Sequence, residues 1–563
     1  MAEIRGTEGA DTLVAQTAYE DTLNGLGGDD TLNPTKVRGV TAFGGAGNDI
    51  LHGGYQARLY GGAGDDTYYV YQFNLKYEIV ATDLVFENDN EGYDVINTTV
   101  SYQLRSSHVE VLQAADPTST NYMYLYGNNE NNVIIGNAGN NELLGLGGND
   151  VIVGGAGADT MWGDGYSDYG DDTFYVDNPG DAIIDGVGYE RVFASVSYAL
   201  GTAQIEELAT IDASATDALN LAGNHHSQAI FGNAGINILH GNGGDDVLWG
   251  FSGNDYLFGD AGADTLSGGL GDDTYYVTDG SDTIVENERE GFDRVAASTS
   301  FFLTALPSIE LLETITPSGT ERIDLSGSGT DNRINGNEGV NILYGQGGSD
   351  TLYGYGGDDY LVGGTGADEM RGGTGNDTYY VDNSSDYVYE AASQGTDRIA
   401  TTISLELSGV SEVETLEVEN SASTAALVLT GSDFSNTIIG NAGNNVINGR
   451  GGSDILVGLG GSDVFQFTSP LGPNNVDRIE DFQVGVDRIA LDDAVFTFAN
   501  PGSLDPAYFR VGSAAQDADD RIIYDSATGA LYYDADGNGS GAAVQFAQLA
   551  AGLSLSASDF MVI

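Results

Sequence analysis

The amino-acid sequence predicts an all-β solenoid, in which short strands stack on one another row by row along the chain. The prediction depends on a nine-residue period that is unbroken over residues 241–276, where the units are GNGGDDVLW, GFSGNDYLF, GDAGADTLS and GGLGDDTYY. Each unit has Gly at its first and fourth positions, Asp at its sixth and a large apolar or aromatic residue at its eighth. Units of this kind recur in about five blocks through the 563 residues.

The first six residues of a unit read as a turn and the last three as a strand. Gly takes positive φ and brings backbone carbonyls close to one point, because it has no Cβ. In the three residues that follow, the central side chain points one way and its neighbours the other, as in a half-buried strand. Two nine-residue units therefore make one coil, and turns that are eighteen residues apart lie on the same side.

The turns are candidate calcium sites, because they combine carbonyl oxygens with the carboxylate of the sixth-position Asp. Hard oxygen ligands in high number are what Ca²⁺ prefers in proteins. We expect Asp246 to share an ion with Asp264, and Asp255 with Asp273. The alternative is a flexible Gly/Asp-rich linker, or Asp acting only through Asx-type turn bonds. A linker does not keep an apolar residue at one phase.

Candidate metal ligands occupy the same unit positions in every block. In the block quoted above they are Gly241, Gly244, Asp246, Gly250, Gly253, Asp255, Gly259, Asp264, Gly268 and Asp273. A later block supplies Gly345, Asp350, Gly354, Asp359, Gly363, Asp368, Gly372 and Asp377. The remaining candidates are Asp30, Asp49, Asp66, Asp150, Asp159, Asp172, Asp454 and Asp463. The N-terminal units are irregularly spaced, so insertions are expected between their rows, and the unit with Asp172 holds four extra residues.

These units resemble the repeat of the RTX, or haemolysin-type calcium-binding, family, whose pattern is G-G-x-G-x-D-x-U-x with U a large apolar residue. The resemblance implies a right-handed parallel β-roll, a β-helix-like solenoid, with calcium bound between stacked turns. It covers every block of nonapeptides in the chain.

A longer period separates the blocks. Four blocks end on an Asp-Thr-aromatic-Tyr-Val tail, and the intervals between these tails are 106, 101 and 104 residues. Alternating apolar residues in the connectors that follow predict short strands, which continue the solenoid as wider rows. The expected segments are a degenerate N-terminal block at 1–70, a connector plus block at each of 71–176, 177–277, 278–381 and 382–467, and a C-terminal cap at 468–563.

Asparagine replaces aspartate in the opening rows of the later blocks, for example at Asn132, Asn332 and Asn436. Asn keeps the turn and an oxygen ligand but adds no charge. We expect these rows to bind calcium weakly or not at all and to stack through Asn ladders. Metal-loaded sites are therefore expected in the later rows of each block.

Acidity dominates the composition, with a formal net charge of −67 and no cysteine. Carboxylates in rows about 4.8 Å apart repel by about 3 kcal/mol per pair, so folding is expected to be coupled to cation binding. The same charge argues against partners such as nucleic acid and anionic lipid. No export signal at the N-terminus and no membrane span are recognised in the sequence.

The last hundred residues differ from the repeats. Residues 477–491, 518–549 and 556–563 resemble the C-terminal region that RTX proteins share with serralysin-type proteases, which caps the roll and carries an uncleaved signal for a type I secretion exporter. An ordinary final strand is the alternative. Asp534–Gly539 looks like half of an EF-hand loop, but Gln545 stands at the twelfth position, so we expect a hairpin turn.

No catalytic motif is recognised: HExxH and G-x-S-x-G are absent, and the pair His225-His226 lacks a third metal ligand. We expect a non-enzymatic, secreted calcium-binding protein that folds on extracellular Ca²⁺ and serves as a structural or adhesive component of the cell surface or matrix, with surface polysaccharide as a candidate partner. The alternatives are a polysaccharide lyase or epimerase on a β-helix platform, and self-assembly into a lattice.

Overall fold

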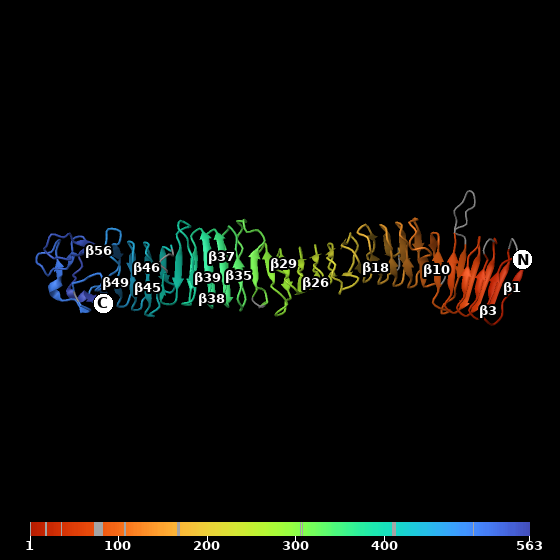
Figure 1. Ribbon diagram of the computed structural model, residues 1–563, viewed down its shortest axis with the longest axis horizontal. Helices are drawn as coiled ribbons and strands as arrows, with labels where there is room; N and C mark the ends of the chain where they lie inside the picture. The colour runs from red at the N-terminus through yellow and green to blue at the C-terminus, as the bar shows by residue number, and fades with distance from the viewer. Residues whose placement is uncertain are drawn as a thin grey trace. The chain divides into compact units, whose positions relative to one another are not determined.

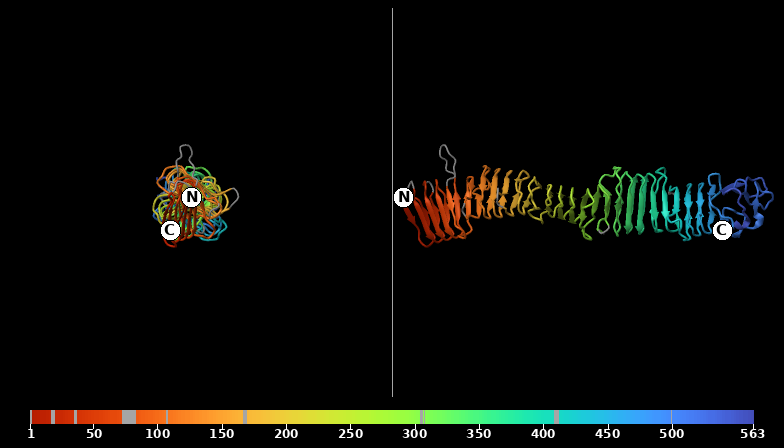
Figure 2. Two further views of the ribbon diagram at one scale, coloured as in Figure 1. Left: turned by 90° about the vertical axis from the view of Figure 1, so that its right-hand side faces the viewer. Right: turned by 180° about the vertical axis from the view of Figure 1, so that it is seen from behind.

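The computed structural model describes residues 2–16, 20–34, 37–71, 83–105, 108–165, 169–303, 306, 308–407, 412–498 and 500–563. The chain divides into two compact units, Met1–Gly291 and Phe292–Ile563. Within each unit, short strands stack row on row (Figure 1), and the view from behind in Figure 2 shows the same rows. The predicted all-β solenoid of parallel strands is therefore confirmed, and the described residues contain no α-helix.

The first unit holds strands β1 to β30, and odd and even strands near the N-terminus belong to different sheets. One five-stranded sheet contains β1 (Glu3–Arg5), β3 (Thr22–Gly27), β5 (Thr41–Ala46), β7 (Arg58–Ala63) and β9 (Leu84–Phe86). Another contains β11 (Tyr102–Gln103), β13 (Tyr124–Tyr126), β15 (Glu142–Leu146), β17 (Thr160–Asp164) and β19 (Ala182–Ile183). A further row is formed by β21 (Tyr198–Ala199), β23 (Asn220–Ala222), β25 (Ile238–His240), β27 (Tyr256–Phe258) and β29 (Thr274–Val277).

A 15-stranded sheet runs through the same unit. Its strands are β2 (Thr12–Val14), β4 (Thr31–Asn33), β6 (Ile50–His52), β8 (Thr67–Val70), β10 (Val95–Thr98), β12 (Val111–Ala114), β14 (Val133–Ile135), β16 (Val151–Val153), β18 (Thr173–Val176), β20 (Arg191–Ala194), β22 (Glu207–Thr210), β24 (Ala229–Phe231), β26 (Val247–Ser252), β28 (Thr265–Leu270) and β30 (Thr283–Ile284). Connector strands such as β10 and β12 stack between nonapeptide strands, so the connectors continue the solenoid as predicted.

The second unit repeats this architecture. One row contains β31 (Arg294–Ala297), β33 (Leu311–Thr314), β35 (Arg333–Asn335), β37 (Thr351–Gly356), β39 (Glu369–Thr374) and β41 (Tyr387–Val388). A 14-stranded sheet contains β32 (Phe301–Phe302), β34 (Leu325–Ser326), β36 (Ile342–Gly347), β38 (Tyr360–Thr365), β40 (Thr378–Val381), β42 (Arg398–Thr401), β44 (Thr415–Val418), β46 (Thr437–Ile439), β48 (Ile455–Val457), β50 (Asp477–Ile479), β56 (Val544–Gln548), β55 (Ala530–Tyr533), β54 (Ile522–Asp525) and β53 (Phe509–Val511). A seven-stranded sheet contains β43 (Leu405–Glu406), β45 (Val428–Thr430), β47 (Val446–Asn448), β49 (Val464–Phe467), β51 (Arg488–Leu491), β57 (Phe560–Val562) and β52 (Gly502–Ser503).

The C-terminal segment ends the parallel stacking of the second unit. Strand β56 pairs parallel with β50, β55 pairs antiparallel with both β54 and β56, and β57 pairs parallel with β51. Two short 3₁₀ helices, η1 (Pro506–Tyr508) and η2 (Ala557–Asp559), lie in this segment. The loop that starts at Asp534 joins antiparallel β55 and β56, which confirms the hairpin turn.

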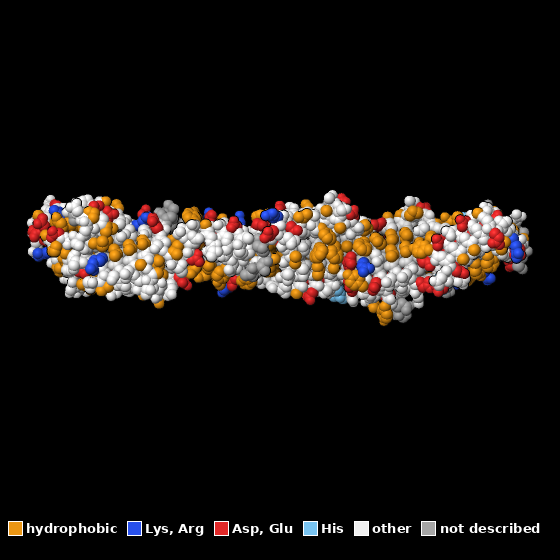
Figure 3. All heavy atoms as spheres, turned by 90° about the horizontal axis from the view of Figure 1, so that it is seen from below, with side chains coloured by type: hydrophobic (Ala, Val, Ile, Leu, Met, Phe, Trp, Pro, Cys, Tyr) orange, Lys and Arg blue, Asp and Glu red, His pale blue; other side chains and the backbone are white. Residues whose placement is uncertain are grey.

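The register of the strands follows the nine-residue period. Val247 of β26 pairs with Thr265 of β28, eighteen residues further on. The eighth-position side chains Leu248, Leu257 and Leu266 are fully buried, at 0% exposure. Their strand neighbours point outward; Trp249, for example, is exposed, and Figure 3 shows hydrophobic side chains gathered in rows on one face.

The buried eighth position carries the apolar core, so truncation there is expected to be costly. Leu361→Ala should lower the free energy of unfolding by about 2–5 kcal/mol, because it leaves a cavity between stacked rows. The outward neighbour Val362→Ala is the matched control and should cost clearly less. Denaturant unfolding of calcium-saturated protein measures both, and equal losses would contradict this account of the core.

Candidate metal centre

The sixth-position aspartates form columns that link each coil to the next. The backbone N–H of Asp246 donates to Oδ1 of Asp264 at 2.8 Å, and that of Asp255 donates to Oδ1 of Asp273 at 2.7 Å. The structure therefore brings together the pairs that the sequence predicts, while an ion between them stays a prediction. The same bond from the preceding coil is accepted by Asp30, Asp49, Asp66, Asp150, Asp159, Asp172, Asp350, Asp359, Asp368, Asp377, Asp454 and Asp463.

In most of these carboxylates the second oxygen, Oδ2, is buried and has no hydrogen-bond partner. A buried polar atom without a partner lowers the stability of the folded state, and a bound ion is one explanation for such an atom. The orphaned Oδ2 atoms belong to Asp30, Asp49, Asp66, Asp150, Asp159, Asp172, Asp246, Asp255, Asp264, Asp350, Asp359, Asp368, Asp377 and Asp454.

Glycine leaves room for a ligand beside each orphaned oxygen. A Cβ placed on Gly241, at the first position of its unit, would collide with Oδ2 of Asp246 and lie 2.6 Å from the carbonyl oxygen of Gly259 in the next coil. A carboxylate oxygen and a carbonyl oxygen thus face the same space. The fourth-position Gly244 has φ of 100°, a left-handed conformation that Gly adopts without a steric penalty and that curls the turn.

Burial raises the pKa of these carboxyl groups. It raises the pKa of Asp246, Asp255 and Asp350 to about 7, and that of Asp359 to about 8. Backbone hydrogen bonds lower each pKa, but desolvation outweighs them. A carboxylate in this setting is stabilised by a proton or by a cation, and a donor set made only of oxygens fits a hard cation such as Ca²⁺.

Nine segments of the chain match the family model described as the RTX calcium-binding nonapeptide repeat. They are residues 5–34, 41–57, 58–74, 126–165, 231–266, 249–284, 326–361, 353–388 and 430–465. The chain carries RTX calcium-binding nonapeptide repeats. The RTX repeats imply calcium binding, and the orphaned carboxylate oxygens described above, except that of Asp172, lie in the matched segments. No curated protein matches the chain.

The Asn rows of this RTX protein differ from the expected Asn ladders. Asn132 donates its side-chain N–H to the carbonyl of Val109 at 3.0 Å, and its backbone N–H donates to Asp150. Asn341 likewise bonds Ile323 in the coil before it and Asn337 in its own turn. Because Asn residues nine apart lie on opposite sides of the coil, each meets a carboxylate in the next coil, and not a second sixth-position Asn.

The connectors also contribute acidic residues to the columns. The sequence did not identify these residues as candidate metal ligands. Asp66 donates its backbone N–H to Asp94, and Asp94 donates in turn to Glu110, at 2.8 and 2.7 Å. Asp172 donates to Glu190 at 2.8 Å. These charged connector positions recur in the sequence. Their place in the columns, however, depends on how the last nonapeptide strand pairs with the first connector strand.

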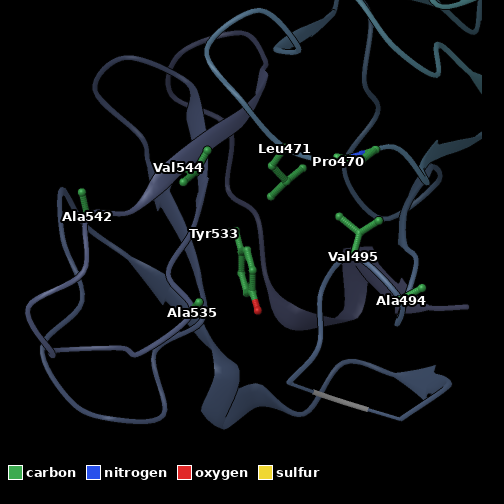
Figure 4. A pocket seen from close by; sticks show the side chains of 8 residues that line it. All are labelled: Pro470, Leu471, Ala494, Val495, Tyr533, Ala535, Ala542 and Val544. Atoms are coloured by element: carbon green, nitrogen blue, oxygen red, sulfur yellow. The ribbon is translucent and has the colours of Figure 1, made fainter.

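Other features of the described residues do not resemble a metal site. The rings of His225 and His226 lie 3.9 Å apart, and the acidic groups near enough to share an ion contain no histidine among the residues searched. A pocket of about 370 Å³ in the C-terminal segment is lined by apolar side chains and the ring of Tyr533 (Figure 4). Within the described ranges, no helix has the length and apolarity needed to cross a membrane.

A methyl group in the space beside an orphaned oxygen should disable one site. Gly354→Ala would place a Cβ 2.6 Å from the carbonyl of Gly372 and against Oδ2 of Asp359. We expect a loss of about 1–3 kcal/mol of stability and fewer bound calcium ions by titration calorimetry. In the control Gly280→Ala the added Cβ meets no atom within 4 Å, so stability and calcium binding should change little. Equal losses in the two variants would contradict a calcium site beside Gly354.

The raised pKa values predict how the metal-free protein responds to pH. The folded pKa of Asp359 and of the neighbouring aspartates lies above the ordinary Asp pKa of 3.8, so between these two pH values the folded state binds more protons than the unfolded chain. The resulting stability is fully present below the unfolded pKa and is lost as pH rises through the folded value near about 7–8. Calcium-free protein should therefore be more β-rich at about pH 5 than at about pH 8, as measured by far-UV circular dichroism, and saturating calcium should reduce the difference. More β-structure in the calcium-free protein at the alkaline pH would contradict this expectation.

Proposed function

We propose that this RTX protein is a secreted, non-enzymatic calcium-binding protein that folds when it meets extracellular Ca²⁺. One observation carries the proposal: columns of buried carboxylates whose second oxygens have no partner, in a chain of net charge −67. Their mutual repulsion opposes folding until cations neutralise them. Extracellular calcium modules bind at about 10⁻⁴–10⁻³ M, so the chain would stay unfolded for a type I exporter and fold outside the cell.

The role that follows is structural or adhesive, at the cell surface or in the matrix. The recurring connector acids Asp94, Glu190 and Asp397 accept backbone hydrogen bonds in the columns at 2.8 Å. A position repeated in each module suits scaffolding better than one active site. Polysaccharide is the proposed partner chemistry, and further copies of the chain would be the partner in a lattice.

A polysaccharide lyase or epimerase is the second candidate, because aromatic rings follow the outer faces of the strands. Phe43, Tyr60 and Phe86 stack at 4.8 and 4.7 Å between ring centroids. Rings in such a row stack on one another, which supports a role in covering the outer face of the sheet. Cleavage or epimerisation of uronic-acid polymers by the purified chain would favour the enzyme.

Calcium titration of the full chain, followed by far-UV circular dichroism with light scattering on the same samples, tests the proposal. We expect a change from disordered to β-rich at sub-millimolar to about millimolar calcium, reversed by chelator, while magnesium at equal concentration is much less effective. A growth in mass on folding would support the matrix role. If the chain is already folded at neutral pH in the presence of a chelator, the proposal that folding is coupled to export is wrong.

A further inference from the structure

The last nonapeptide of a block is followed by a connector that places an acid where the repeat has glycine. Tyr60 of β7 pairs with Phe86 of β9, so the next residue, Glu87, stacks on the first-position Gly61. In the second unit Met370 of β39 pairs with Val388 of β41, and the same register stacks Glu390 on Gly372. Inside a block, the residue at that place is a Gly that offers only its carbonyl. The junction therefore adds a carboxylate that the rows inside a block do not have at this place.

Three carboxylates converge at each of these two junctions. Asp66, Glu87 and Asp94 each offer an oxygen, and these oxygens lie within 4.8 Å of one another. Asp377, Glu390 and Asp397 do the same. All six residues are buried, Glu87 being the most exposed at 6%. The ion pairs found among the described residues include none of the six.

The hydrogen bonds in these two groups of three carboxylates, here called triads, leave several carboxylate oxygens without a partner. Asp66 donates its backbone N–H to Oδ1 of Asp94 at 2.8 Å, and Gly61 donates to Oε1 of Glu87 at 3.2 Å. Oδ2 of Asp66, Oδ2 of Asp94 and Oε2 of Glu87 are left buried without a partner. The second junction keeps Oδ2 of Asp377 and Oε2 of Glu390 in the same state.

A buried phenol provides a second, independent sign of a ligand. The side chain of Tyr68 is fully buried at 0% exposure, and its hydroxyl has no hydrogen-bond partner. A Cβ on Gly61 would collide with this hydroxyl as well as with Asp66 and Glu87, so all three groups are aimed at one space. At the second junction the hydroxyl of Tyr379 contacts Glu390 and accepts the N–H of Gly372 at 2.6 Å.

The phenol and the glutamate occur together. Tyr275 contacts Glu286 across the same eleven-residue separation as Tyr379 and Glu390. In the block that ends at Asp172, Phe174 replaces the tyrosine, and Asp185, eleven residues later, replaces the glutamate. Glutamate thus occurs with tyrosine, whereas the shorter aspartate occurs with phenylalanine, which has no hydroxyl group. The pairing indicates that phenol and glutamate serve one local purpose.

We propose that Asp66–Glu87–Asp94 and Asp377–Glu390–Asp397 form a second class of calcium site, distinct from the sites inside the nonapeptide blocks. Each site joins the last coil of a block to the connector that follows, and takes a hard divalent cation through three carboxylates and a phenol oxygen. The higher negative charge makes it the tighter class. The inference rests on the proposed calcium-binding function and adds to it which sites fill first.

Titration calorimetry of calcium binding to the full chain tests this with charge-removing variants of equal size. Glu390→Gln and Glu87→Gln should each remove one ion from the tightest class, and the double variant should remove two. Tyr379→Phe should keep the number of ions and weaken binding at the site that contains Glu390 about tenfold. Glu419→Gln, an exposed acid of the same connector, is the matched control and should behave like the unchanged chain.

The outcomes separate this inference from the proposed function. If the unchanged chain binds calcium and folds, but the glutamine variants keep every tight ion, the triads are neutralised by protons and the inference is wrong. If the unchanged chain binds no calcium, the proposed function fails and the inference with it. A variant that does not fold is replaced by anomalous scattering from crystals of the calcium-loaded chain: a peak among Asp377, Glu390 and Asp397 supports the site, and its absence beside occupied nonapeptide sites overturns it.

Discussion

The hydrogen bond from the backbone N–H of one coil to the carboxylate of the next is the interaction on which both units depend. It fixes the spacing of the turns, as between Asp246 and Asp264, and it requires the carboxylate to be buried. Because Asp264 uses one carboxylate oxygen in this bond, its other oxygen faces the space beside Gly259. Stacking and charge are therefore inseparable: the geometry that builds the columns also concentrates the negative charge that a proton or a cation must neutralise.

Glycine and asparagine adjust this column in opposite ways. Glycine at the first position keeps side chains away from the orphaned oxygen and so preserves room for an ion. Asparagine at the start of a block uses its amide to bond the coil before it, as Asn132 does with Val109, and so joins connector and block without added charge. Each larger module thus begins with a neutral attachment and proceeds to charged rows. In the second unit the charged rows end at a junction where Glu390 and Asp397 add carboxylates.

The apolar face of each strand supplies a stability that is separate from the charge. Eighth-position side chains such as Leu248 and Leu361 are fully enclosed, and their burial favours the fold at any calcium concentration. Opposing it are the carboxylates, whose pKa values are raised by the same enclosure. A chain balanced between these two terms responds to a small change in cation concentration, which is the physical basis of the proposed folding on calcium.

The amino-acid sequence alone predicts the solenoid, the eighteen-residue stacking, the buried eighth position and the nonapeptide aspartates of the columns, because each depends on a strict nine-residue period. It did not reveal that Glu87 stacks on Gly61, since twenty-six residues of different composition separate them and only the pairing of β7 with β9 sets their register. Nor did it reveal where the Asn132 amide points, because its acceptor belongs to the connector coil before it. Periodic neighbours are encoded locally, whereas neighbours across an insertion are decided by which backbone hydrogen bonds the stacked strands complete.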